Sequence, residues 1–116
     1  MKAIESEDSI QKRAEALLVQ LGIPYVRIPS VILSRFFCSK SVSIWHKRDV
    51  AKYLSGIPDL MIFDKKKGTY KAIEIKTEKG RVSPKQKMWI EALGAVVTKG
   101  WEETKVEILA FHQENS

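Results

Sequence analysis

The sequence predicts an α/β domain in which helices flank one mixed β-sheet. Three observations predict this fold class: an early segment with helical periodicity, two apolar runs joined by a lysine-rich turn, and a second helix with its own start and stop signals. A chain of 116 residues can close one hydrophobic core, and no linker, internal repeat or low-complexity tract divides it. We therefore expect residues 1–116 to form a single domain.

The first helix is predicted over residues 6–22. Apolar residues recur there at steps of three and four, which is typical of a helix with one buried face; they are Ile10, Ala14, Leu17, Leu18 and Leu21. Gly22 and Pro24 follow the last of them, and both residue types end helices. This segment is therefore expected to pack one apolar stripe against the sheet.

A β-hairpin is the clearest feature of the middle of the chain. The runs DLMIF (residues 59–63) and YKAIEIK (residues 70–76) are separated by KKKG, which is typical of two strands and a turn. Another short strand is expected at residues 25–28. Residues 31–38 fit either a strand or a buried loop, and the stretch around residues 43–46 has no clear period. Residues 49–54 are expected to form a short helix.

The second helix is predicted over residues 83–93. Ser83 can act as its N-cap, Pro84 occupies the first helical position and Gly94 ends it. Residues 95–98 and 106–111 are apolar and rich in β-branched side chains, so each is predicted to be a strand. The expected order is helix, strand, hairpin, helix, strand, strand.

The composition favours a protein with a polyanionic partner inside the cell. Twenty Lys and Arg residues outnumber fourteen Asp and Glu, which leaves a net charge of +6 and suits nucleic acid, although a merely soluble surface has the same composition. Cys38 is the only cysteine, so no internal disulfide forms and a reducing cytoplasm is expected. No signal peptide or membrane-spanning run is recognisable.

Two carboxylates and one ammonium group are predicted to meet on the hairpin. If the turn is centred between Lys66 and Lys67, Asp59 lies opposite Glu74, with their Cβ atoms about 5 Å apart. Lys76 is two residues from Glu74 and leaves the same face of the strand. Two carboxylates this close repel unless a cation lies between them, and oxygen ligands favour Mg²⁺ or Mn²⁺. A structural ion pair of Lys76 with either carboxylate is the alternative.

The motifs around these residues resemble a known nuclease family. Pro58-Asp59 followed by Glu74-Ile75-Lys76 is similar to the PD-(D/E)xK nuclease signature. The longer segments GIPDLMIF and AIEIKTEKGRVSPKQKMWIEAL, with the GAVV that follows, resemble the VRR-NUC family of virus-type replication and repair nucleases. The resemblance covers roughly residues 6–98. It implies a restriction-endonuclease-like fold with an αβββαβ core.

The resemblance also implies roles for residues at the matching positions. Asp59 and Glu74 are expected to bind Mg²⁺ or Mn²⁺, with the carbonyl oxygen of Ile75 as a further ligand. Lys76 is expected to orient the attacking water and to stabilise charge on the phosphate in the transition state. The expected chemistry is metal-assisted hydrolysis of a phosphodiester bond in DNA.

The family also has an acidic residue on its first helix, and Glu7 is our choice for that metal ligand. At 100° per residue Glu7 points within roughly 20° of Ala14, in line with the buried stripe, whereas Glu5 and Asp8 project elsewhere. The alternative is a surface acid that the positive end of the helix stabilises.

Gln86 matches the family's glutamine on the second helix and is expected to be catalytic, through contact with a metal-bound water, Lys76 or a phosphate. The same residue also completes a Ser83-x-x-Gln86 capping box, which needs no functional explanation. Both interpretations stay open at this point, and they are compatible.

Basic residues near the motif are expected to hold the DNA backbone. Each taken alone is more often a solvated surface residue; the candidates are Lys47, Arg48, Lys79, Arg81, Lys85 and Lys87. Such contacts need positive charge and carry no sequence code, so they suit an enzyme that selects DNA by its structure.

The leading functional hypothesis is a metal-dependent endonuclease of the VRR-NUC type that acts in DNA replication, recombination or repair. The resemblance implies a homodimer that cuts branched DNA like a Holliday-junction resolvase, encoded by a virus or prophage and active in the bacterial cytoplasm. One alternative is a non-catalytic nucleic-acid-binding module with a nuclease-like fold, although such relatives usually lose a residue that is present here. A sequence-specific restriction enzyme ranks lower, because the chain leaves little room for a base-reading domain.

Overall fold

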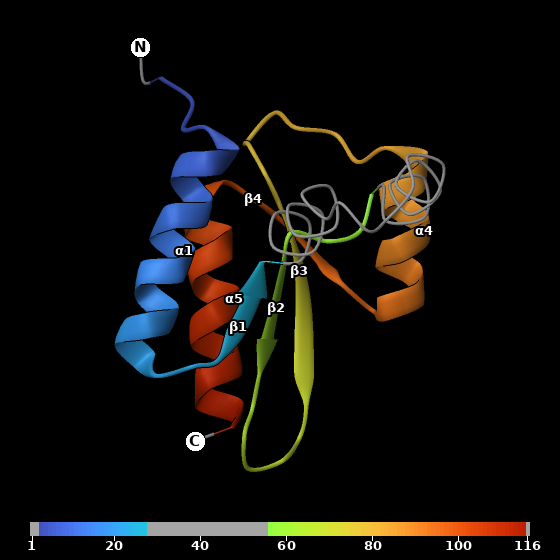
Figure 1. Ribbon diagram of the computed structural model, residues 1–116. Helices are drawn as coiled ribbons and strands as arrows, with labels where there is room; N and C mark the ends of the chain where they lie inside the picture. The colour runs from blue at the N-terminus through green and yellow to red at the C-terminus, as the bar shows by residue number, and fades with distance from the viewer. Residues whose placement is uncertain (1–2, 28–55, 116) are drawn as a thin grey trace, which may run out of the picture.

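The computed structural model describes residues 3–27 and 56–115, which form a four-stranded mixed sheet and three helices (Figure 1). The strand order is β1-β2-β3-β4, with β1, β2 and β3 antiparallel and β4 parallel to β3. In chain order the elements are α1 (Glu7–Leu21), β1 (Tyr25–Arg27), β2 (Leu60–Phe63), β3 (Tyr70–Lys76), α4 (Pro84–Leu93), β4 (Val96–Lys99) and α5 (Gly100–Glu114).

The helices cover the sheet from two sides. α1 and α5 pack against each other and against β3, and α4 lies on the other side of β3 (Figure 1). The core joins α1, the strands and α5; it contains Ile10, Ala14, Leu18, Ile23, Leu60, Ile62, Ile73, Ile75, Ile108 and Phe111. The predicted mixed sheet flanked by helices is confirmed, and its αβββαβ order is present up to β4.

The predicted first helix is confirmed at both ends. The Ser6 hydroxyl accepts a hydrogen bond from the backbone N–H of Ser9 at 3.1 Å, as an N-cap does. Gly22 adopts φ 69°, a left-handed conformation that suits glycine, and its N–H bonds to carbonyls of the last turn. The strand that follows comprises Tyr25–Arg27.

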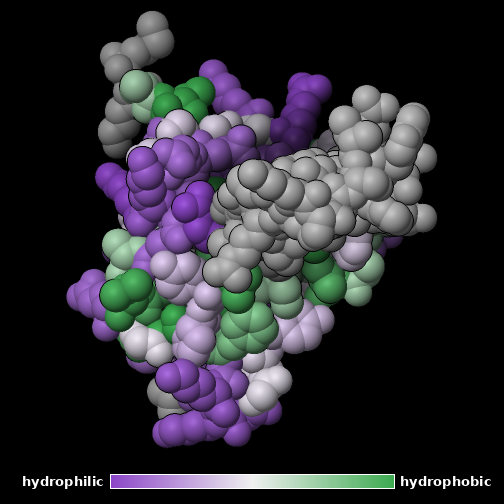
Figure 2. All heavy atoms as spheres, in the orientation of Figure 1, coloured by the Kyte–Doolittle hydropathy of each residue, from purple (hydrophilic) through white to green (hydrophobic). Residues whose placement is uncertain are grey.

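The hairpin has the predicted register. Leu60 pairs with Ile73 and Met61 with Ala72, so the turn is centred between Lys66 and Lys67 as expected. β2 begins at Leu60, one residue later than predicted. The tip of this hairpin, which carries three lysines, forms a hydrophilic end of the molecule in Figure 2. This register brings position 59 opposite position 74.

The second helix and the strand after it also follow the sequence prediction. Ser83 is the N-cap of α4 and Gly94 its C-cap, while β4 lies one residue further along the chain than expected. β3 and β4 are parallel neighbours, so the chain must cross over between them, and α4 forms that crossover.

The prediction of a strand at residues 106–111 is wrong, because this segment belongs to α5. The buried positions Thr104, Ile108 and Phe111 are spaced by four and three residues, which is a helical period. Val106 and Leu109, which made the segment look like a strand, are 62% and 38% exposed. Helix α5 completes the layer that α1 begins.

Several predictions fall on residues 28–55, which lie outside the described part of the chain. They include the end of the first strand, the short helix at 49–54, and the assignments of Cys38, Lys47 and Arg48. In residues 3–27 and 56–115, no helix combines the length and apolar character needed to cross a bilayer.

Candidate active site

Glu74 is buried near the C-terminal end of β3. Its neighbours Ile73 and Ile75 point into the hydrophobic core, and side chains alternate along a strand, so Glu74 points to the opposite face. Only 1% of its surface is exposed. A carboxylate in this position needs partners, because burying an unpaired charge is strongly unfavourable.

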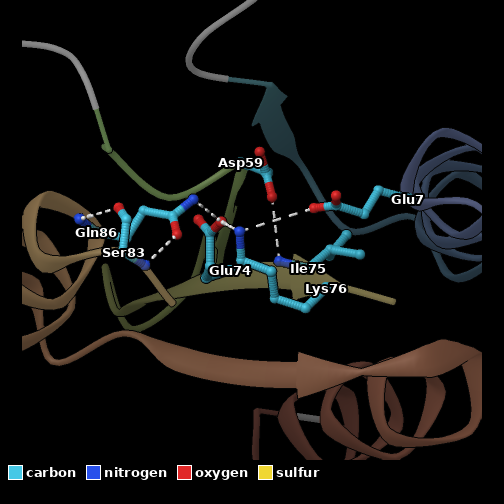
Figure 3. A network of polar contacts seen from close by, with 7 residues as sticks. All are labelled: Glu7, Asp59, Glu74, Ile75, Lys76, Ser83 and Gln86. Carbon is cyan, nitrogen blue, oxygen red and sulfur yellow. Dashed lines mark hydrogen bonds and ion pairs between the residues drawn. The ribbon is translucent and has the colours of Figure 1, made fainter. Parts of the chain in front are cut away.

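Asp59 is held beside Glu74 by the backbone of β3. It comes immediately after the buried Pro58 and before β2, at the position that the hairpin register places opposite Glu74. Its Oδ2 accepts a hydrogen bond from the N–H of Ile75 at 3.1 Å. The aspartate is therefore fixed to the strand that carries the glutamate (Figure 3).

Lys76 brings its ammonium group among the carboxylates. Its Nζ lies 3.5 Å from Oε1 of Glu74 and 4.0 Å from Oε1 of Glu7. Glu7 extends from the first turn of α1, and the ammonium group lies between it and the buried glutamate (Figure 3). The lysine is 8% exposed, whereas the side chain of Glu7 is 52% exposed. Glu7 therefore contacts the site only by its ion pair with Lys76 among the described residues, and its own side chain is partly exposed to solvent.

Gln86 connects α4 to the same carboxylate. Its side-chain Nε2 donates to Oε1 of Glu74 at 2.9 Å. Its Oε1 accepts from the backbone N–H of Ser83 at 2.9 Å, and its own backbone N–H donates to the Ser83 hydroxyl at 3.2 Å. Gln86 therefore completes the capping box and also contacts Glu74, so the two interpretations of this residue describe one geometry.

Burial and mutual repulsion change the acidity of both carboxyl groups. Burial is the largest cause that raises the pKa of Glu74 to about 7, and the charge of Asp59 adds to it, while Lys76 opposes both. Burial also raises the pKa of Asp59, against the hydrogen bond from Ile75. Without a cation the pair therefore tends to keep one proton near neutral pH.

The two oxygens of the buried carboxylate differ in their partners. Among residues 3–27 and 56–115, Oε2 of Glu74 has no hydrogen-bond partner, although Oε1 of the same carboxylate has two. Asp59, Glu74 and the carbonyl of Ile75 offer oxygen donors, which suit a hard cation such as Mg²⁺. Within residues 3–27 and 56–115, however, no three acidic, histidine or cysteine side chains form a ready-made cluster for a metal ion.

The other predicted site residues lie on the surface or outside the described part of the chain. Lys79, Arg81, Lys85 and Lys87 are exposed, on α4 or on the segment that joins β3 to it. Lys47 and Arg48 fall in the range that is not described. The structure thus gathers Glu7, Asp59, Glu74, Lys76 and Gln86 at one end of β3. The described basic residues contribute exposed charge on α4 and on the segment before it.

Sequence analysis assigned no role to Gly56, whose backbone lies against the first turn of α4 beside Gln86. Its φ is +85°, and a Cβ atom built on it would lie 2.7 Å from the backbone nitrogen of Gln86. Only glycine allows such a close approach. The signal in the sequence was a glycine three residues before Asp59, but a sequence alone does not show which backbone it meets.

Comparison with known proteins gives the family and the fold of the chain. The VRR-NUC domain family matches residues 6–104 of the chain. A solved structure described as a VRR_NUC domain protein superposes with a TM-score of 0.61 at 20% sequence identity, covering 100% of this chain and 93% of that one. Such low identity indicates a shared fold only. No curated protein matches the chain.

Proposed function

Because this chain belongs to the VRR-NUC family and carries a nuclease-like domain, we propose that it is a metal-dependent endonuclease that hydrolyses phosphodiester bonds in DNA. The observation that carries the proposal is the buried, unpartnered Oε2 of Glu74 beside Asp59 and Lys76. A carboxylate oxygen with no donor is costly in a buried site, and a divalent cation would satisfy it.

Asp59, Glu74 and the carbonyl of Ile75 would hold Mg²⁺ or Mn²⁺, with Glu7 as a further acidic ligand from α1. When bound, the cation supplies Lewis-acid chemistry that makes water more acidic and offsets negative charge on the phosphate. The remaining chemistry belongs to the side chains of the protein.

Lys76 is suited to stabilise charge near the scissile phosphate. Its ammonium group is nearly buried, so its interactions are screened less than those of a surface lysine. In this position it would donate hydrogen bonds to the attacking water or to a non-bridging phosphate oxygen. Gln86 holds Oε1 of Glu74, which keeps that carboxylate in place while the substrate binds.

The exposed basic residues Lys79, Arg81, Lys85 and Lys87 would bind the DNA backbone close to the site. They supply charge without a code for the bases, which supports selection of DNA by structure. We extend the proposal to branched DNA as the substrate and to two copies of the chain acting together on it.

The test is to incubate the protein with four-way junction, flap, nicked, single-stranded and linear duplex DNA, in Mg²⁺, in Mn²⁺ and in EDTA. Metal-dependent cleavage that is lost in Glu74→Ala and in Lys76→Ala supports the proposed site. Paired nicks in the junction, with a dimer in sedimentation, support the extension to branched DNA. DNA binding without cleavage in either metal would instead favour a non-catalytic module.

A further inference from the structure

The side-chain amide of Gln86 has only one orientation that satisfies its surroundings. Its oxygen accepts from the N–H of Ser83 and its nitrogen donates to Oε1 of Glu74, both at 2.9 Å. If the amide turned over, two donors would face each other at one end and two acceptors at the other. The capping box thus determines which group Gln86 presents to Glu74.

Ser83 holds Gln86 at two points. Besides its backbone N–H, which binds the side chain of Gln86, its hydroxyl accepts from the backbone N–H of Gln86 at 3.2 Å. The reciprocal pair places Gln86 in the first turn of α4 with both its backbone and its side chain fixed. Ser83 can therefore influence Glu74 through Gln86.

Gly56 lies directly against the same turn of α4. A Cβ atom at this position would lie 2.7 Å from the backbone nitrogen of Gln86 and 2.7 Å from the carbonyl carbon of Lys85. The segment from Gly56 leads directly to Pro58 and Asp59. The first turn of α4 is therefore in contact with the loop that carries one site carboxylate and, through Gln86, with the other.

We propose that Ser83 and Gly56 are positioning residues: they hold the amide of Gln86 so that it occupies Oε1 of Glu74 and leaves Oε2 to the cation. This inference rests on the proposed metal-dependent function. It explains why one oxygen of a buried carboxylate has two partners while the other has none. It also gives the capping box a second role besides stabilising α4, which is to orient the amide of Gln86.

The first experiment uses metal-free protein and follows the side-chain amide protons of Gln86 by nuclear magnetic resonance. In the wild-type protein they should resonate away from free amides and exchange slowly with solvent. Ser83→Ala keeps the backbone N–H that binds the side chain of Gln86 but removes the hydroxyl that holds its backbone, so it should weaken both properties. Ser83→Thr should restore them, because threonine keeps the hydroxyl. Free-amide signals in the wild-type protein, or no change in Ser83→Ala, would overturn the proposal.

The second experiment measures Mn²⁺ binding by calorimetry. Residues that orient metal ligands typically contribute about 10- to 100-fold to affinity, so Ser83→Ala should weaken binding roughly tenfold. The matched control is Gly94→Ala at the other end of α4, where φ is +63° and a Cβ meets nothing within 4 Å. It should destabilise the same helix and change the affinity less than about twofold. Equal losses in both variants would mean that Ser83 only stabilises α4 and would overturn the proposal.

Gly56→Ala provides an independent check, since its Cβ would displace the first turn of α4. If the variant folds, it should lose the Gln86 amide signature as Ser83→Ala does; retention of the signature would exclude a role for Gly56. If it does not fold, the two Ser83 variants still decide how Gln86 is held, and they alone then decide the proposal. Wild-type protein that binds no Mn²⁺ would reject the proposed function, whereas the amide signals would still decide how Gln86 is held.

Discussion

Lys76 Nζ lies 3.5 Å from Oε1 of Glu74, and the two side chains leave the same face of β3, two residues apart. Both are almost fully buried. A buried pair of this kind contributes little net stability, because the cost of removing both charges from water offsets their attraction. The pair is therefore weak evidence for a stabilising role in the fold.

Replacing the ammonium group should abolish most of the catalysis. We expect Lys76→Met to slow cleavage by roughly 100- to 1,000-fold, the usual effect of removing one group that stabilises transition-state charge. The measurement is a single-turnover rate with saturating Mg²⁺. Lys71→Met is the matched control on the same strand, because Lys71 pairs with Glu107 at 2.7 Å and lies away from the site. A similar slowing in both variants would contradict the assigned role.

The stability of the metal-free protein should depend on pH through Glu74. Because its pKa rises from 4.5 to about 7 on folding, the folded state binds this proton more tightly than the unfolded chain does. The contribution of this carboxyl is thus present below pH 4.5 and is lost as the pH rises through 7. Relative to wild type, Glu74→Gln should gain roughly 3 kcal/mol of unfolding free energy between pH 4.5 and pH 8.

Urea unfolding in EDTA at several pH values measures that difference. Glu91→Gln, which changes an exposed carboxylate on α4, serves as the control and should show no such gain. A constant difference between wild type and Glu74→Gln across this pH range would contradict the raised pKa of Glu74. Adding Mn²⁺ should reduce the difference, since the cation favours the charged carboxylate.

The hydroxyl of Thr104, which has no part in the proposed chemistry, should matter for stability. It is fully buried and lies 2.8 Å from the hydroxyl of Thr98 and 2.9 Å from the carbonyl of Gly100, so it ties α5 to β4. Thr104→Val keeps the shape and takes this buried partner from the Thr98 hydroxyl, at a cost of about 1–3 kcal/mol. Thermal unfolding measures this loss of stability. Thr69→Val, which removes an exposed hydrogen bond, is the control and should cost less. Equal losses would argue against the buried contact.

The basic residues near the site should contribute to DNA affinity in a salt-dependent way. Neutralising one phosphate contact, as in Arg81→Gln or Lys85→Gln, should lower the slope of log affinity against log salt by roughly one. Binding is measured in proteins that also carry Glu74→Ala, so that the DNA is not cleaved during the measurement. Lys65→Gln, at the hairpin tip on the opposite end of β3, should leave the slope unchanged (Figure 1). An unchanged slope in all three variants would exclude this surface.

Local patterns were enough to predict most of the elements. The helical period and Gly22 predicted α1, and Ser83, Pro84 and Gly94 predicted α4, because caps and breakers act over a few residues. The prediction of a strand at residues 106–111 failed because the local composition there does not determine the structure. Val106 and Leu109 are apolar but exposed, so the segment has a strand-like composition with a helical burial pattern that depends on its packing against α1 and β4.

The sequence by itself determined the hairpin register, and with it the opposition of Asp59 and Glu74, because strand pairing follows from turn position and a period of two. It also indicated that Lys76 shares the face of Glu74. Only the tertiary structure decided that Gln86 donates to Glu74, that Gly56 meets the backbone of α4, and that Glu7 approaches Lys76 from the solvent side. Those contacts join segments far apart in the chain, and their geometry depends on how helices pack on the sheet rather than on any local pattern.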